Sequence, residues 1–206
     1  MARPRQNKNR RDELIQQGKD LLSEHGYHGT GLKKILDTVN VPKGSFYNYF
    51  ESKEKFVSEI IEQYGRDMAV KLDDFIDQSD ENPLDTIRNI YKAISIEIEK
   101  NGQKGCLVGN LAAEIGDSSV LCQKSMQSAC ASWKRRFKTF ISDAQDQGLI
   151  RNDLSAGTLC DVLWDTWQGA LLKIKIDGDT THLTQTIDVL LNHLFLPVQS
   201  NQNNNT

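Results

Sequence analysis

The chain has 206 residues, a hydrophobic share of 38% and a formal net charge of -3, which suits one large or two small globular domains. No apolar run approaches the roughly 18 residues of a membrane-spanning helix, and none follows the basic N-terminus, so we do not expect a membrane or exported protein. The four cysteines are widely spaced and form no Cys-x-x-Cys pair. We therefore expect reduced thiols in a cytoplasmic protein.

The charge is unevenly distributed along the chain. Residues 1–55 hold 11 Lys and Arg against 7 Asp and Glu, a net charge of +4, which leaves -7 for the remainder. A basic head on an acidic body fits a protein that places one end against phosphates, because cations near DNA release condensed counterions. A solubilising basic segment is the alternative at this point.

Apolar residues recur at steps of three and four along most of the chain, a period typical of helices. No strand-like alternation competes with this pattern, so we predict an all-α fold of about nine helices. The predicted helices cover residues 10–25, 32–38, 43–50, 52–78, 83–101, 106–115, 118–147, 155–174 and 181–196. Gly26 is expected to end the first of these helices, and Ser155 is expected to cap the eighth. The polar tail, residues 199–206, is predicted to be disordered.

The first three short helices have the proportions of a helix-turn-helix, with a tight connection over residues 39–44. Residues 26–56, GYHGTGLKKILDTVNVPKGSFYNYFESKEKF, resemble the DNA-binding signature of the TetR family. The resemblance rests on the Pro-Lys-Gly-Ser-Phe-Tyr entry to the third helix, the aromatic cluster and the Ser-Lys-Glu that begins the fourth helix. It implies a DNA-binding domain over residues 1–53, with a basic N-terminal arm, and a helical effector-sensing and dimerisation domain over residues 54–198.

The third helix of the motif is predicted to face DNA with its polar side. Phe46 and Phe50, four residues apart, can share the inward face. We expect Asn48 to contact a base edge and the hydroxyls of Tyr47 and Tyr49 to contact phosphates. The full predicted DNA-binding set is Thr30, Lys33, Lys43, Gly44, Ser45, Tyr47, Asn48, Tyr49 and Lys53, where Thr30 is also the expected N-cap of the second helix. Arg3, Arg5, Arg10 and Arg11 form the arm, which either enters a minor groove or stays solvated.

The resemblance implies a homodimer on a near-palindromic double-stranded operator, with the last two helices of each subunit forming the interface. Apolar residues on these helices offer a surface for that contact. The predicted interface residues are Leu163, Trp167, Leu171, Ile187, Leu191 and Leu194. The alternative is that both helices belong to the internal core.

A second motif, Gly105-Cys106-Leu107-Val108-Gly109-Asn110-Leu111, resembles an element in the branch of the family that includes NemR-like and AcuR-like repressors. That branch responds to reactive electrophiles or acrylate-type acids, which implies a small-molecule effector here. Cys106 stands near the start of a helix, where free amides and the neighbouring Lys104 favour a thiolate. We predict that effector sensing involves Cys106, with Lys175 as a cationic partner and Trp133 and Trp167 lining a pocket.

Three alternatives remain open from the sequence. Cys106 is either a covalent sensor or an inert buried thiol beside a reversible pocket for a hydrophobic ligand, and Lys175 either points inward or snorkels to solvent. A thiol-dependent enzyme is less favoured, because the four histidines show no metal or catalytic spacing and no hydrolase or phosphate-loop motif occurs. We expect no catalytic residues, no metal and no cofactor, and a cytoplasmic, nucleoid-associated regulator without a membrane partner. Cys122, Cys130 and Cys160 are interpreted as structural thiols.

Overall fold

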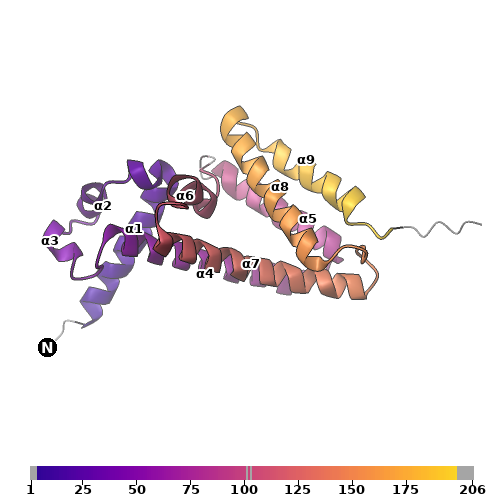
Figure 1. Cartoon of the computed structure of the whole chain (residues 1–206), viewed down its shortest axis with the longest axis horizontal. Coiled ribbons are helices and arrows are strands. Elements are labelled where there is room, and N and C mark those ends of the chain that lie inside the picture. The colour runs from indigo at the N-terminus through magenta and orange to yellow at the C-terminus, as the bar shows by residue number, and fades with distance from the viewer. Residues whose placement is uncertain (1–3, 101, 103, 199–206) are drawn as a thin grey trace, which may run out of the picture. The chain divides into compact units, whose positions relative to one another are not determined.

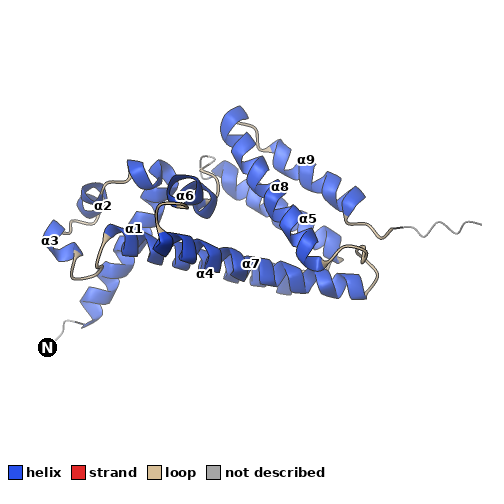
Figure 2. Cartoon of the chain, in the orientation of Figure 1, coloured by secondary structure: helices blue, strands red, loops and turns tan. Residues whose placement is uncertain are grey.

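The computed structural model describes residues 4–100, 102 and 104–198, and the side chains from residue 9 onward. Its described residues form nine α-helices and a short π-helical turn, without a strand (Figures 1 and 2). The α-helices are α1 (Pro4–Gly29), α2 (Leu32–Thr38), α3 (Lys43–Phe46), α4 (Lys53–Asp77), α5 (Pro83–Lys100), α6 (Leu107–Ile115), α7 (Val120–Asp146), α8 (Ala156–Asp177) and α9 (Thr181–Val189), and the π-turn covers Leu190–Leu194. The predicted all-α fold is confirmed. The predicted tail over residues 199–206 lies outside the described residues.

The chain divides into two compact units. The first unit holds residues 1–71 and 104–133, and the second holds residues 72–103 and 134–206, so α4 and α7 each contribute to both. These units are defined by how compactly their residues pack. The predicted boundary at residue 53 separates a DNA-binding domain from an effector-sensing domain, and it stays a prediction.

The first unit contains α1, α2, α3 and α6 with the first parts of α4 and α7. Gly26 interrupts the helical backbone of α1 with φ 68°, in agreement with its predicted place at a helix end. Earlier in α1, Gly18 lies so close to α4 that an added Cβ would come within 2.4 Å of the Phe56 ring. The absence of a side chain at Gly18 therefore lets the two helices approach closely.

The parts of α4 and α7 in the first unit run parallel. The hydroxyls of Ser58 and Ser125 share a buried hydrogen bond of 2.9 Å. Further along, a Cβ placed on Gly65 would lie 2.7 Å from that of Ala129, so the backbones approach closely. Small side chains along this seam set the register between the helices.

The second unit packs α8 and α9 side by side, and α5 also contacts α9 (Figure 1). Arg88 of α5 donates to Asp188 of α9 at 2.8 Å and to Asn192 of the π-turn at 2.9 Å. Ser155 caps α8 as predicted, since its hydroxyl accepts the Thr158 amide at 3.0 Å. Among the described helices, none is both long and apolar enough to cross a membrane.

Two helices are shorter than predicted. The helix expected over residues 43–50 ends at Phe46, because Asn48 and Tyr49 donate to carbonyls three residues back and so tighten the chain into a turn. The helix expected over residues 181–196 is α-helical only to Val189 and then widens into the π-turn. Apolar periodicity does not distinguish these neighbouring helical forms, because they differ only in hydrogen-bond spacing.

Candidate DNA-binding surface and sensor site

An aromatic core supports the short helix α3. Phe46 and Phe50 are 0% and 2% exposed, which confirms their predicted inward orientation. Their ring centroids lie 5.3 Å apart, and the Phe56 ring of α4 lies 5.5 Å from Phe46 and 4.7 Å from Phe50. Packing of this kind fixes the direction in which the other side of α3 points.

The opposite side of α3 and the turn after it are open to solvent. Tyr47 is 56% exposed. Lys43, Gly44 and Asn48 are also exposed, and Ser45 and Tyr49 are half-buried. On α2, the exposed Lys33 pairs with Asp37 at 2.6 Å. The predicted polar residues of α3 and Lys33 of α2 are therefore at the surface, where their groups can meet a nucleic acid.

Two residues predicted to contact DNA have partners within the protein. Thr30 is fully buried, and its hydroxyl donates to the Leu21 carbonyl at 3.1 Å. The N-cap of α2 is Gly31, so the predicted capping role of Thr30 is wrong. Lys53 donates to the Tyr27 carbonyl at 2.7 Å, and its ammonium lies 4.0 Å from the centre of the Tyr27 ring. Burial lowers the pKa of Lys53 from its ordinary value.

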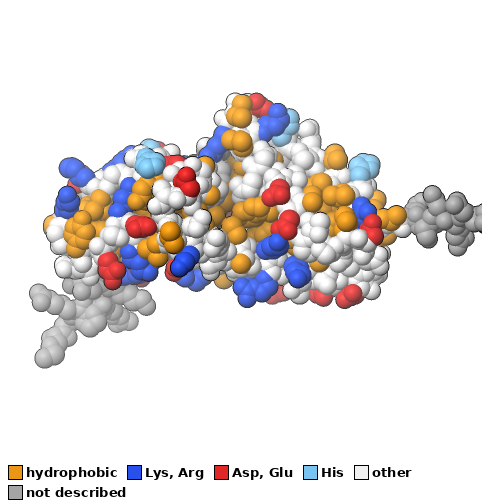
Figure 3. Space-filling model, viewed as in Figure 1, with side chains coloured by type: hydrophobic (Ala, Val, Ile, Leu, Met, Phe, Trp, Pro, Cys, Tyr) orange, Lys and Arg blue, Asp and Glu red, His pale blue; other side chains and the backbone are white. Residues whose placement is uncertain are grey.

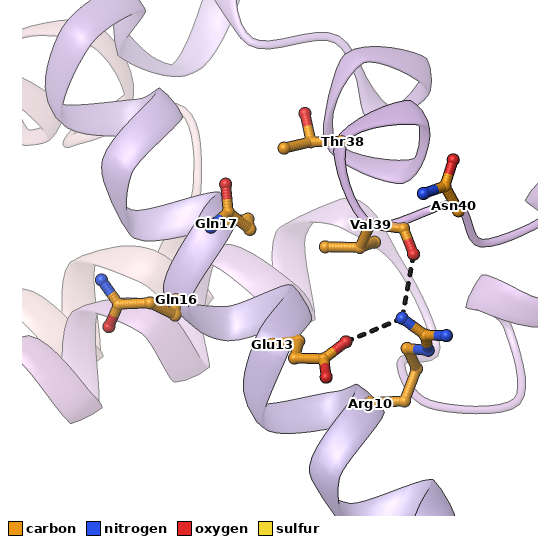
Figure 4. A pocket seen from close by; sticks show the side chains of 7 residues that line it. All are labelled: Arg10, Glu13, Gln16, Gln17, Thr38, Val39 and Asn40. Carbon is orange, nitrogen blue, oxygen red and sulfur yellow. Dashed lines mark hydrogen bonds and ion pairs between the residues drawn. The ribbon is translucent and has the colours of Figure 1, made fainter.

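The basic residues predicted as an arm belong partly to α1. Arg10 donates to Glu13 at 2.8 Å and to the Val39 carbonyl at 3.1 Å, across a pocket of about 360 Å³ between α1 and the α2–α3 turn (Figure 4). Arg11 pairs with Glu59 and lies 5.0 Å from the centre of the Phe50 ring. Both arginines thus hold helices together in this structure. Arg3 and the side chain of Arg5 lie outside the described residues.

Cys106 is the N-cap of α6 and its side chain is almost fully buried, with 4% exposed. The Tyr64 hydroxyl of α4 lies 4.0 Å from the Cys106 sulfur and is oriented to donate to it. The loop before α6 is held by the Asn110 side chain, which donates to the Lys104 carbonyl at 2.9 Å. No sequence signal pointed to Tyr64, because it lies 42 positions before the cysteine and shares no motif with it.

The predicted sensor residues fall in both units. Cys106 and the half-buried Trp133 belong to the first unit, whereas the buried Trp167 and the exposed Lys175 belong to the second. A joint site of these four residues therefore stays a prediction. Across the described ranges, no three His, Cys, Asp or Glu side chains are grouped to hold a metal ion.

Both ends of α6 contact α1 in the first unit. Before the helix, Lys104 pairs with Glu24 at 3.5 Å. In the last turn, the Glu114 carboxylate accepts the His28 amide at 3.0 Å. An added Cβ on Gly26 would lie only 1.9 Å from this carboxylate. Sequence reasoning missed Glu114, although it lies in the same segment as Cys106.

The predicted interface residues are mostly internal. Leu163, Trp167, Leu171, Ile187 and Leu191 are each no more than 6% exposed, and Leu194 is half-buried. They form the core of the second unit in this structure, because the most apolar side of α8 and of α9 faces the interior of the same subunit. The apolar side chains left exposed on these helices are Leu172, Ile176 and Val189, at 61%, 74% and 58%.

The remaining cysteines are largely enclosed. Cys122 and Cys160 are fully buried, and burial raises the pKa of Cys160 to about 12. Cys130 is half-buried on α7. Burial raises the pKa of Cys130 to about 11, and the neighbouring Cys106 adds to that increase.

Comparisons with known proteins agree with this arrangement. Residues 14–60 match the family model described as bacterial regulatory proteins, tetR family, and residues 83–190 match that described as tetracyclin repressor-like, C-terminal domain. The chain is 32% identical to the HTH-type transcriptional repressor DhaR of Mycobacterium sp. (strain GP1), over 94% of this chain and 96% of the relative. It is 33% identical to the transcriptional regulator AcuR of Cereibacter sphaeroides, over 80% and 75%.

A similar solved structure is that of E. coli NemR in its reduced form. It superposes with a TM-score of 0.79 at 26% identity and covers 89% of this chain and 96% of that one. These similarities confirm the resemblance inferred from residues 26–56 and 105–111. The named relatives are transcriptional regulators, so the comparisons favour a regulator over a thiol-dependent enzyme.

Proposed function

The chain belongs to the TetR family of bacterial regulatory proteins, and from that premise we propose that it is an effector-responsive transcriptional repressor. It binds a near-palindromic operator as a homodimer. A small reactive electrophile, aldehyde or acrylate-type molecule acts at or near Cys106 and releases the repressor from the operator. The observation that carries the proposal is the exposed polar side of α3 on a packed aromatic core, within the segment that matches the family model.

Operator recognition is assigned to α3, to the turn that follows it and to Lys33 of α2. Asn48 presents an amide that can pair with a base edge, and the exposed Tyr47 can donate its hydroxyl to a phosphate. Lys33 and Lys43 add sequence-independent attraction to the backbone. Thr30 and Lys53 act by holding α2 and α4 in place, as their contacts within the unit indicate.

Dimerisation is assigned to the outer faces of α8 and α9. Leu172, Ile176 and Val189 are large apolar side chains that are more than half exposed on these helices. Figure 3 shows apolar side chains at the surface over α8 and α9 on the face that it presents. A second copy of the chain would remove this apolar area from water, which favours association.

The enclosure of Cys106 limits which electrophiles can reach it. Its side chain is 4% exposed, so a small carbonyl or acrylate-type molecule fits the proposal better than a bulky one. The Tyr64 hydroxyl is placed to donate a hydrogen bond to the sulfur that attacks the electrophile. Addition of carbon atoms in such a packed place must displace its neighbours.

The helix α6 is the proposed route from Cys106 to the DNA-binding helices. A change at the N-cap of α6 alters the position of a short helix whose two ends contact α1 through Lys104 and Glu114. Because α1 packs on α2, a shift of α6 changes the arrangement of the helices that carry the DNA-contacting residues. An effector needs only to bind the two arrangements unequally to change operator affinity.

One observation favours a reversible effector as a second candidate. Within the described residues of the second unit, the fully buried Tyr91 hydroxyl has no hydrogen-bond partner, and the Gln168 side-chain nitrogen has none either. Buried polar groups usually have partners. A carbonyl or carboxylate of a bound molecule would give such a group a hydrogen-bond partner without any reaction at Cys106.

Operator binding by the purified protein separates these proposals. We expect acrylate, or a small quinone, to release wild type from its operator and to leave Cys106→Ser bound. Equal release of both proteins would favour the reversible effector, and Tyr91→Phe should then weaken the response. Failure of wild type to bind any DNA from its own promoter region, with Asn48→Ala behaving identically, would reject the repressor proposal itself.

A further inference from the structure

Two consecutive residues of α4 lie near two cysteines of the first unit. The Tyr64 hydroxyl lies 4.0 Å from the Cys106 sulfur. The next residue, Gly65, approaches α7 at Ala129, where an added Cβ would be 2.7 Å from the Ala129 Cβ. Cys130 directly follows Ala129. Consecutive residues of α4 thus contact Cys106 and the immediate neighbour of Cys130.

The direction of the Cys130 side chain agrees with this placement. Cys130 lies four residues, about one helical turn, after the buried Met126, so the two side chains share one side of α7. Met126 is 5% exposed and Cys130 is half-buried.

The backbone immediately before α6 is not helical. Cys106 is the N-cap of α6 and has extended backbone angles, φ -86° and ψ 123°. Gly105 before it has φ 76°, a conformation that only glycine adopts easily. The Cys106 carbonyl accepts the first hydrogen bond of α6, from the Asn110 amide at 2.9 Å, while the backbone angles of Cys106 itself are not helical.

We propose that Cys130 is the resolving thiol for Cys106, so that a peroxide-class oxidant closes a reversible Cys106–Cys130 disulfide between α6 and α7. The inference rests on the proposed role of Cys106 as the sensor and adds oxidants to the electrophiles that it detects. A disulfide brings two sulfurs within about 2 Å and two Cα atoms within about 4.4–6.8 Å. Closing it pulls the start of α6 toward α7 and moves the helix that contacts α1.

The chemistry balances with the oxidant alone. The Cys106 thiolate attacks one peroxide oxygen, so an S–O bond forms, the O–O bond breaks and the other oxygen leaves as water or an alcohol. The Cys130 thiolate then attacks the sulfenic sulfur, so the S–S bond forms, the S–O bond breaks and the hydroxide takes up the Cys130 proton as water. Two thiols lose two electrons in total, and one peroxide gains them.

Thiol mapping on the full-length reduced protein tests the inference. After treatment with one equivalent of hydrogen peroxide, we expect wild type to lose two alkylatable thiols and to yield a peptide that joins Cys106 to Cys130. Dithiothreitol should restore both thiols. In Cys130→Ser, dimedone should trap a sulfenic acid at Cys106 and no joined peptide should form. Cys122→Ser, which removes a buried thiol of the same unit, is the matched control and should behave as wild type.

The outcomes separate this inference from the proposed function. Acrylate should still release Cys130→Ser from operator DNA, because alkylation of Cys106 requires no second thiol. A wild-type protein in which Cys130 stays reduced, or in which Cys106 pairs with another cysteine, overturns the inference and leaves the electrophile sensor intact. If circular dichroism shows that Cys130→Ser is poorly folded, Cys130→Ala replaces it. A Cys106–Cys130 disulfide in a protein that acrylate does not release from DNA would reject only the electrophile sensor.

Discussion

The carboxylate of Glu114, in the last turn of α6, accepts the backbone amide of His28 in the last turn of α1 at 3.0 Å. This hydrogen bond joins the helix that begins at Cys106 to the first helix of the DNA-binding segment. It brings together residues 86 positions apart, and Gly26 makes room for it by having no side chain.

Loss of this acceptor should reduce the response to effector more than it reduces DNA binding. In Glu114→Ala, the His28 amide loses its partner, and we expect the effector concentration for half-release of operator to rise about tenfold, within the usual range of coupling energies. Glu114→Gln keeps a carbonyl oxygen at the same place and should respond as wild type. Fluorescence anisotropy of labelled operator measures both quantities. The exposed Asp117→Ala, which removes a nearby charge, is the control, and an equal loss there would contradict the proposed route.

Two helical glycines should respond to alanine with opposite signs. Gly18→Ala places a Cβ 2.4 Å from the Phe56 ring, so we expect the free energy of unfolding to fall by about 1–3 kcal/mol through overpacking. Gly169→Ala in α8 meets nothing within 4 Å and should raise it by about 0.5–1 kcal/mol, because alanine restricts the unfolded chain. Urea denaturation provides both values. A Gly18→Ala protein as stable as wild type would show that α1 and α4 can separate without cost.

The lysines assigned to the phosphate backbone should act without regard to operator sequence. Lys43→Ala and Lys33→Ala should each weaken specific and non-specific binding alike, and each should lower the slope of log K against log salt by about one, because one phosphate is no longer neutralised. Asn48→Ala should instead narrow the difference in affinity between operator and random DNA. Binding titrations over a range of salt concentrations separate the two effects. Lys92→Ala, an exposed lysine on α5, should leave the slope unchanged.

Charged residues on the outer faces of α8 and α9 should break the proposed dimer and spare the fold. Leu172→Asp and Ile176→Asp introduce a charge at side chains that are 61% and 74% exposed, so the subunit core stays intact. We expect sedimentation velocity to show monomers at concentrations where wild type is dimeric, with unchanged circular dichroism. Val70→Asp, at an apolar residue of similar exposure on α4, is the control. Dimers that persist in both α8 variants would place the interface elsewhere.

Alkaline pH should destabilise the protein through its buried thiols. Burial raises the pKa of Cys160 from 9.0 to about 12. Between these two values, the unfolded chain releases the proton and the folded chain keeps it, so stability is complete below pH 9 and falls as pH rises toward 12. The urea midpoint should fall less steeply with pH in Cys160→Ala than in wild type. The cavity that the substitution leaves lowers the urea midpoint at every pH, so the two proteins are compared by the slope of the midpoint against pH. Equal slopes would contradict the role given to Cys160.

Local features of the chain were predictable from the sequence. The bounds of α2 agree with the expected residues 32–38, and Ser155 caps α8 as expected. The inward orientation of Phe46 and Phe50 followed from their spacing. Such features depend on residues within about one or two helical turns, because the apolar spacing and the capping residues that govern them are close together in the sequence.

Other features were decided by contacts between distant residues. Burial of Thr30 depends on the Leu21 carbonyl across a turn, and the removal of Leu163 from the surface depends on how α8 packs in its own unit. The sequence determined which helices form, which face of α3 is polar and to which family the chain belongs. The tertiary structure alone brought Glu114 to His28 and Tyr64 to Cys106, because side chains far apart in the chain meet only when the helices pack.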